Sequence, residues 1–259
     1  MAACKVCENP LVIEVDDEDG NDEVQLVPDD LETSCGCHFH WQCLLDHAAK
    51  LAISLKCPSC DSGLATNVAG PSVTNPFLQS APGASILTRY TNEGGVQENY
   101  DILPAITEEA YLEANPEARP ARAYHVMCSE GDVEGIVDLL RDAEQQAEDG
   151  VPTMNATQLV RYQDPLSNSK SGLHLAVEKR QEEVVWLLLW IASTLATEAF
   201  PGPAVQAAQA MGIQRPSTLA SDDIRALTDN QGRTAEAVAT QIGGIWTTIL
   251  ESGALHPGS

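Results

Sequence analysis

Basic residues are scarce in this chain. Only 14 of its 259 residues are Lys or Arg, against 38 Asp or Glu, so the formal net charge is −24 at pH 7. A surface this acidic repels nucleic acids and anionic membranes, because few of their phosphates can be neutralised. We therefore expect neither nucleic acid nor membrane as a partner.

Aromatic residues, long apolar runs and an export signal are also lacking. Aromatics make up 5% of the chain, which favours helices built on Leu, Val and Ala over a β-sandwich. The longest apolar run, residues 184–196, is shorter than the roughly 20 residues that span a bilayer. The N-terminal MAACKVCENP has no basic stretch followed by an apolar run, which argues against a secretory signal. We expect an intracellular protein, cytoplasmic or nuclear.

Cysteine, by contrast, is concentrated in one place. Seven of the eight cysteines fall within the first 60 residues, together with three histidines. In a reducing compartment such a cluster indicates metal binding rather than disulfides. Two Cys-x-x-Cys pairs, CKVC from Cys4 and CPSC from Cys57, are turns that present two thiolates to one tetrahedral zinc. The intervening CGCHFHWQC (35–43) supplies two more ligand pairs.

This spacing resembles a RING finger, whose pattern is Cys-x-x-Cys, a long loop, Cys-x-(His or Cys)-x-Phe-His-x-x-Cys, a second loop and Cys-Pro-x-Cys. The resemblance covers residues 4–60. It fills all eight ligand positions, with Cys4, Cys7, Cys35, Cys37, His40, Cys43, Cys57 and Cys60. RING fingers interleave their pairs, so the resemblance implies one Zn²⁺ on the first and third pairs and another on the second and fourth. We favour Cys37 over the adjacent His38, because Phe39 and His40 then keep the family register.

Other zinc folds fit less well. A histone-tail-reading PHD finger has a wider gap before its histidine and an aromatic shortly before its last cysteine pair, where this chain has Ser54, Leu55 and Lys56. A zinc ribbon does not account for the Phe39–His40 register. The membrane-bound RING variant with cysteine in the fourth slot is disfavoured because no membrane span follows.

The resemblance implies a ligase without covalent chemistry of its own. A RING binds a ubiquitin-charged conjugating enzyme and holds the thioester in a reactive pose, so its rate gain is positional. With every ligand supplied by protein, neither zinc has an open position for water. The implied docking residues are apolar, with packing in a small core as the alternative for the two leucines: Val6, Leu44, Leu45 and Pro58.

Two positions depart from the pattern of active RINGs. Asp61 stands where a basic residue often follows the eighth ligand, and His47 replaces a common Trp. Neither change prevents zinc binding or docking. Both motivate a second hypothesis, a non-catalytic adaptor, and leave open whether the chain is an enzyme.

The remainder of the first half has low-complexity segments. The acidic insertion at 14–33 either steers a basic conjugating enzyme or is a solvated loop. Residues 62–88, rich in Ser, Pro, Gly, Ala and Asn, are typical of a linker. The segment ITEEAYLEA predicts a short helix with Thr107 as its N-cap. We expect a RING-type domain at 1–61 and a linker with this helix at 62–121.

Residues 122–256 contain a repeat that resembles ankyrin repeats. Segments starting at Arg122, Ser171 and Thr234 share one frame, in which His125 and His174 take the family's histidine slot. The starts lie 49 and 63 residues apart, against about 33 in an uninterrupted array, so insertions are required. We expect an additional helix in the PAVQAAQAMGI insertion and histidines that bond the turn backbone. Cys128 and the histidines fit packing better than catalysis.

Together these resemblances imply a small two-zinc cross-brace RING domain plus a mainly α-helical, ankyrin-repeat-like domain. The function this predicts is a RING-type ubiquitin ligase, or a subunit of one, with two structural Zn²⁺. Its partners would be a ubiquitin-conjugating enzyme and a protein substrate bound by the repeats.

Overall fold

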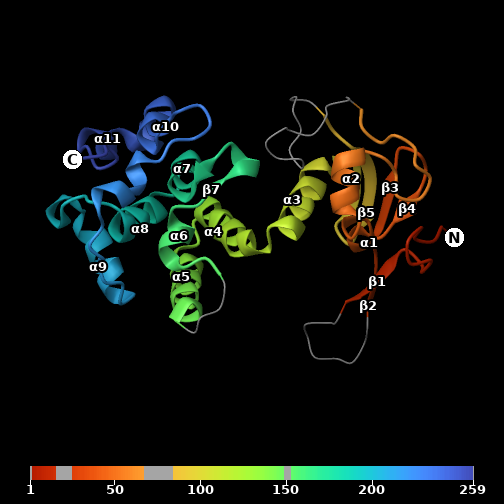
Figure 1. The fold of residues 1–259 in the computed structure, drawn as a ribbon, viewed down its shortest axis with the longest axis horizontal. Coiled ribbons are helices and arrows are strands. Elements are labelled where there is room, and N and C mark those ends of the chain that lie inside the picture. Colours follow the sequence, from red (N-terminus) through yellow and green to blue (C-terminus); the bar gives the residue numbers. More distant parts are fainter. Residues whose placement is uncertain (1, 16–24, 67–83, 149–152, 259) are drawn as a thin grey trace. The chain divides into compact units, whose positions relative to one another are not determined.

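A computed structural model describes residues 2–15, 25–66, 84–148 and 153–258 (Figure 1). The chain divides into two compact units, one ending at Pro116 and one starting at Glu117. The first unit is longer than the domain expected at residues 1–61, because residues 84–116 pack against the cysteine-rich segment. Residues 16–24 of the acidic insertion and 67–83 of the predicted linker lie outside the described residues.

A four-stranded antiparallel sheet organises the first unit, in the order β4-β3-β5-β6. Strand β5 lies beside β3, so a hairpin from beyond the cysteine-rich segment completes the sheet that the segment begins. A separate two-stranded ribbon, β1 with β2, leaves most of its side chains exposed. The strands are β1 (Val12–Val15), β2 (Gln25–Pro28), β3 (Asp30–Thr33), β4 (His38–Phe39), β5 (Leu87–Asn92) and β6 (Gly95–Asp101).

Within the described residues of this unit the sheet is accompanied by helices α1 (Trp41–Leu45), α2 (Ala48–Ser54) and α3 (Leu103–Ala114). Helix α3 packs against α2 and presents apolar residues spaced three and four apart. The core joins the two ends of the unit through side chains that are no more than 1% exposed: Leu31, Phe39, Leu44, Leu51, Ile86, Ile102 and Ile106.

Helix α3 corrects one sequence expectation. Thr107 is not the N-cap, because the helix begins four residues earlier, at Leu103. Pro104 lies in the first turn, where its missing N–H costs no hydrogen bond. The Thr107 hydroxyl instead donates to the Leu103 carbonyl, 2.7 Å away, inside the helix.

The second unit consists mainly of helices arranged in successive pairs. Helices α4 and α5 form one pair, α7 and α8 the next, and α7 lies between α4 and α10. A short hairpin of β7 and β8 precedes α7. The elements are α4 (Arg119–Glu130), α5 (Val133–Glu148), α6 (Ala156–Val160), β7 (Gln163–Asp164), β8 (Lys170–Ser171), α7 (Gly172–Glu178), α8 (Glu182–Ala192), α9 (Gly202–Ala210), α10 (Ala235–Ile242) and α11 (Thr247–Glu251).

Close packing joins α4 to α7. Gly172, the first residue of α7, has no room for a Cβ atom, which would lie 2.5 Å from the Tyr124 hydroxyl on α4. Helix α8 contributes the largest apolar face, and Val184, Val185, Leu187 and Leu188 are buried as their spacing predicts; the additional helix expected in the 203–213 insertion is α9. None of the helices in the described part of the chain combines the length and apolar character needed to cross a bilayer.

Candidate metal centres

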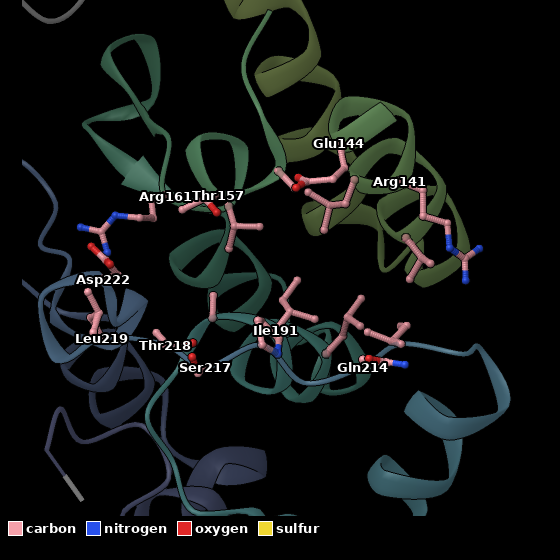
Figure 2. A pocket seen from close by; sticks show the side chains of 18 of the residues that line it. Arg141, Glu144, Thr157, Arg161, Ile191, Gln214, Ser217, Thr218, Leu219 and Asp222 are labelled. Carbon is pink, nitrogen blue, oxygen red and sulfur yellow. The ribbon is translucent and has the colours of Figure 1, made fainter. Parts of the chain in front are cut away.

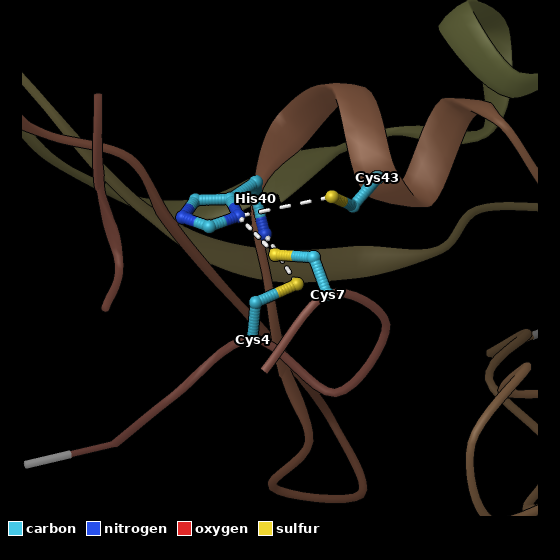
Figure 3. Close-up of side chains that lie close together, drawn as sticks. All are labelled: Cys4, Cys7, His40 and Cys43. Carbon is cyan, nitrogen blue, oxygen red and sulfur yellow. Dashed lines mark hydrogen bonds between the residues drawn. The ribbon is translucent and has the colours of Figure 1, made fainter. Parts of the chain in front are cut away.

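The first centre combines two cysteines from the N-terminal turn with two residues around the start of α1. Cys4 and Cys7 face His40, which precedes α1, and Cys43, which lies within it (Figure 3). The four donor atoms all lie within 4.8 Å of one another. His40 Nδ1 is 3.2 Å from Cys7 Sγ and 3.7 Å from Cys43 Sγ. Donors bound tetrahedrally to one zinc are separated by roughly 3–4 Å, so the geometry fits.

A backbone carbonyl fixes which histidine nitrogen faces the thiols. His40 Nε2 lies 2.8 Å from the Pro10 carbonyl oxygen, to which an Nε2–H donates. That tautomer leaves the Nδ1 lone pair directed toward Cys7 and Cys43. Zinc-binding histidines commonly have such a partner on the second nitrogen, because it orients the ring and raises its basicity.

The second centre consists of four cysteines: Cys35, Cys37, Cys57 and Cys60. Their sulfur atoms also lie within 4.8 Å of one another, and the Cys35 and Cys60 Sγ atoms are 3.5 Å apart. Four thiolates around one point are a donor set typical of structural zinc. The two clusters are therefore positioned to bind two metal ions, and both donor sets suit zinc.

The two Cys-x-x-Cys turns have the same backbone form. Glu8 and Asp61, the residues after each pair, have φ angles of 63° and 58°. The Glu8 N–H donates to the Cys4 carbonyl at 2.9 Å, and the Asp61 N–H donates to the Cys57 carbonyl at 3.0 Å. This turn brings the two sulfurs of each pair to one side of the backbone, which two ligands of one metal ion require.

The structure also distinguishes Cys37 from its neighbour. Cys37 Sγ belongs to the second cluster, whereas His38 Nδ1 lies 2.7 Å from an oxygen of Asp30. Gly36, with φ of 77°, permits the tight turn between Thr33 and Cys37. His38 therefore points to a carboxylate rather than to the sulfurs.

Without a cation, the clustered thiols ionise unequally. Burial raises the pKa of Cys43 and of Cys57 to about 12. Burial also opposes ionisation of Cys4, but backbone N–H groups outweigh it and lower its pKa to about 6. The hydrogen bond with Ser62 lowers the pKa of Cys60 to about 6. A bound divalent cation would stabilise the thiolate form of every ligand cysteine at once, so the buried thiols could be ionised together with the others.

The sequence motifs did not identify three residues that support the first centre. The buried carboxylate of Asp29 accepts a hydrogen bond from the Trp41 N–H, at the start of the helix that carries Cys43. The Tyr90 hydroxyl donates to the same carboxylate at 3.0 Å, and its ring lies against Trp41. Burial beside Asp29 raises the Tyr90 pKa to about 12. No short motif marks these contacts, since Tyr90 is 61 residues from Asp29.

The four predicted docking residues differ in exposure. Val6, inside the first cysteine pair, is 39% exposed, whereas Leu44 is 1% exposed and belongs to the core. Leu45 and Pro58 are half-buried. Core packing, the alternative considered for Leu44, is thus what the structure shows for this residue, and docking stays a prediction for all four. Asp61 is exposed and His47 is half-buried.

In the second unit the histidines make equivalent contacts. His125 Nε2 lies 3.2 Å from the Tyr162 carbonyl oxygen, and His174 Nε2 lies 2.9 Å from that of Arg233. Each histidine thus bonds the turn before the next helix pair, as expected from the sequence. Cys128 is fully buried, and burial raises its pKa to about 12, so it is not a reactive thiol.

Comparison of the chain with known protein families, with curated proteins and with solved structures finds no match.

Proposed function

We propose that the first unit is a RING-type domain that binds two zinc ions and docks a ubiquitin-charged conjugating enzyme. The observation that carries the proposal is the interleaving of the ligand pairs: Cys4 and Cys7 lie with residues 40 and 43, whereas Cys35 and Cys37 lie with residues 57 and 60. Along the sequence, the first and third ligand pairs thus share one cluster, and the second and fourth pairs share the other. This crossed arrangement matches the ligand order implied by the sequence resemblance.

The zinc ions would be structural. Each cluster already offers four protein donors, so neither ion would have an open position for water or substrate. The chain's own contribution would be positional: Val6 and Pro58, on the two Cys-x-x-Cys turns, and Leu45 would contact the conjugating enzyme. Such contacts hold a thioester in a reactive orientation without forming a covalent bond to the ligase.

We further propose that the second unit is an ankyrin-like repeat array that recognises a protein substrate. Support comes from the paired helices and from the equivalent bonds of His125 and His174 to the following turns. In a repeat array each helix pair cannot bury its apolar face alone and requires its neighbours. The chain as a whole would then be a RING-type ubiquitin ligase or a ligase subunit.

A thioester discharge assay tests this function. The zinc-loaded full chain should accelerate ubiquitin release from at least one member of a broad panel of charged conjugating enzymes. Val6→Ala or Pro58→Ala should reduce the acceleration about tenfold, because a buried apolar contact at an interface is worth over 1 kcal/mol. Val126→Ala, at a valine 48% exposed in the second unit, is the matched control and should retain full activity. No acceleration with any member would contradict the proposal.

A non-catalytic zinc adaptor is the second candidate, and Asp61 favours it. Its exposed carboxylate stands where a cation would bridge ubiquitin and the conjugating enzyme. Asp61→Arg should therefore raise discharge activity, while Asp61→Asn controls for loss of the negative charge and tolerates the φ of 58° better. If Asp61→Arg retains two zinc ions and leaves the rate unchanged, Asp61 is not what limits activity.

A further inference from the structure

The second unit contains a cavity of about 480 Å³ between α5, α6, α8 and the irregular segment 212–219 (Figure 2). This volume lies within the range of sites that bind small molecules or a few side chains. Much of its wall is apolar and comes from three helices and the irregular segment: Val137, Leu140, Val160, Leu187, Ile191 and Ile213. An occupant would therefore need an apolar body.

One cationic side chain in this wall lacks a partner. Arg161, which directly follows α6, makes no side-chain hydrogen bond or ion pair with any residue that the structure describes. Its Nη1 atom is also shielded from solvent. A guanidinium that is partly withdrawn from water and has no acceptor is unfavourable, so an anionic ligand that reaches the accessible part of this side chain from the cavity gains energy.

The other charged groups of the wall do not meet this need. Arg141 donates to the Met211 carbonyl and to the Asp138 carboxylate. Figure 2 places Asp222 and Arg161 toward one end of the cavity and Arg141 toward the other. Arg161 Nη1 nevertheless has no hydrogen-bond partner, Asp222 included, among the residues that the structure describes. Glu144 lies on α5. The unpaired cation is thus at one end of an apolar cavity.

We propose that this cavity binds an aliphatic ligand that ends in a carboxylate, with the chain against the apolar wall and the carboxylate on the Arg161 guanidinium. A carboxylate matches the planar fork of arginine with two parallel hydrogen bonds. The same chemistry occurs in a medium-chain fatty acid and in the aliphatic C-terminus of a protein. The site is separate from the cysteine clusters and does not depend on the function proposed for them.

Isothermal titration of the zinc-loaded full chain tests the proposal with two pairs of probes. One pair is octanoate and octanamide; the other is acetyl-Gly-Ser-Gly-Leu-Leu with a free or an amidated C-terminus. Binding of octanoate alone assigns a fatty acid, and binding of the free peptide alone assigns a protein C-terminus. In either case the carboxylate should bind at least tenfold more tightly than its amide.

Two variants assign the charge recognition to the cavity. Arg161→Gln should remove the preference for the carboxylate and leave the far-UV circular dichroism unchanged. Asp222→Asn removes a nearby acid and should tighten carboxylate binding severalfold. The proposal is overturned if neither carboxylate binds at millimolar concentration or if acid and amide bind equally. It is also overturned if Asp222→Asn lowers the melting temperature without tightening binding, since Arg161 would then serve only to balance Asp222.

Discussion

The hydroxyl of Tyr90 and the buried carboxylate of Asp29 are joined by a 3.0 Å hydrogen bond, although 61 residues separate them. Because Asp29 also accepts from the N–H of Trp41, this bond links the β5–β6 hairpin to the helix that carries Cys43. The hairpin is therefore part of the support of the first metal centre.

Removing this link should destabilise the first unit. Tyr90→Phe should lower the free energy of unfolding by about 1–2 kcal/mol, because the hydroxyl bonds a charged acceptor. Asp29→Ala should cost about 2–3 kcal/mol, because it also leaves the Trp41 N–H without an acceptor. Urea unfolding of the zinc-loaded chain measures both. Tyr100→Phe on β6 is the matched control, because its ring also lies against Trp41 while its hydroxyl bonds none of the residues that the structure describes. Equal effects of the two tyrosine variants would count against the link.

Acid should weaken the second unit through His125. Burial lowers its pKa from 6.5 to about 4, and its Nδ1 has no partner that would accept a second proton. As the pH falls, His125 therefore takes up a proton in the unfolded chain before it does so in the folded chain. The contribution of neutral His125 to the free energy of unfolding is complete above pH 6.5 and is lost as the pH falls toward 4. The full loss is about 3 kcal/mol. The pKa of His174 is lowered in the same direction, also by burial.

Tryptophan fluorescence during urea unfolding follows this change, because three of the four tryptophans lie in the second unit. His125→Gln keeps a side-chain N–H for the Tyr162 carbonyl. It should make the free energy of unfolding less dependent on pH between 6.5 and 4.5. An unfolding free energy that is constant over that range in the unsubstituted chain would disprove the assignment.

The contact of Gly172 with Tyr124 predicts an unusual effect of alanine. Alanine normally favours a helix over glycine by about 1 kcal/mol. Here its Cβ would lie 2.5 Å from the Tyr124 hydroxyl oxygen and 2.7 Å from ring carbons, so Gly172→Ala should destabilise the second unit by about 1–3 kcal/mol. Gly202→Ala at the start of α9 is the control, because nothing lies within 4 Å of its Cβ. Thermal unfolding should separate the two variants, and equal melting temperatures would refute the packing argument.

Chelation should affect the two units differently. The core of the first unit includes the ligand residues Cys4, Cys37 and Cys57, so much of its folding energy should depend on bound metal, whereas the core of the second unit contains none of the ligands. Hydrogen exchange in EDTA should show loss of protection before Pro116 and retention after Glu117. Protection lost equally in both units, or in neither, would be inconsistent with a metal-stabilised first unit.

The sequence predicted the features that depend on short motifs. The grouping of eight cysteine and histidine side chains into two sets of four and the histidine bonds to turns were implied by the resemblances to RING fingers and ankyrin repeats, which short motifs carry. Helix α9 was expected in the 203–213 insertion. Helix α3 was predicted, but with a later start, whereas the β5–β6 hairpin was missed although the Gly94-Gly95 dipeptide is a turn signal. Their place in the first unit depends on the packing of Ile86, Ile102 and Ile106 against distant residues, which no local pattern encodes.

Metal content of the purified full chain tests the central claim, the crossed pairing of ligands, most directly. We predict two zinc ions per chain by elemental analysis, and still two after Cys128→Ala. Joint replacement of Cys4 and Cys43 by alanine should remove one ion, while joint replacement of Cys4 and Cys57 should remove both. No bound zinc in the unsubstituted chain, or loss of a single ion from the Cys4 and Cys57 double variant, would contradict the account.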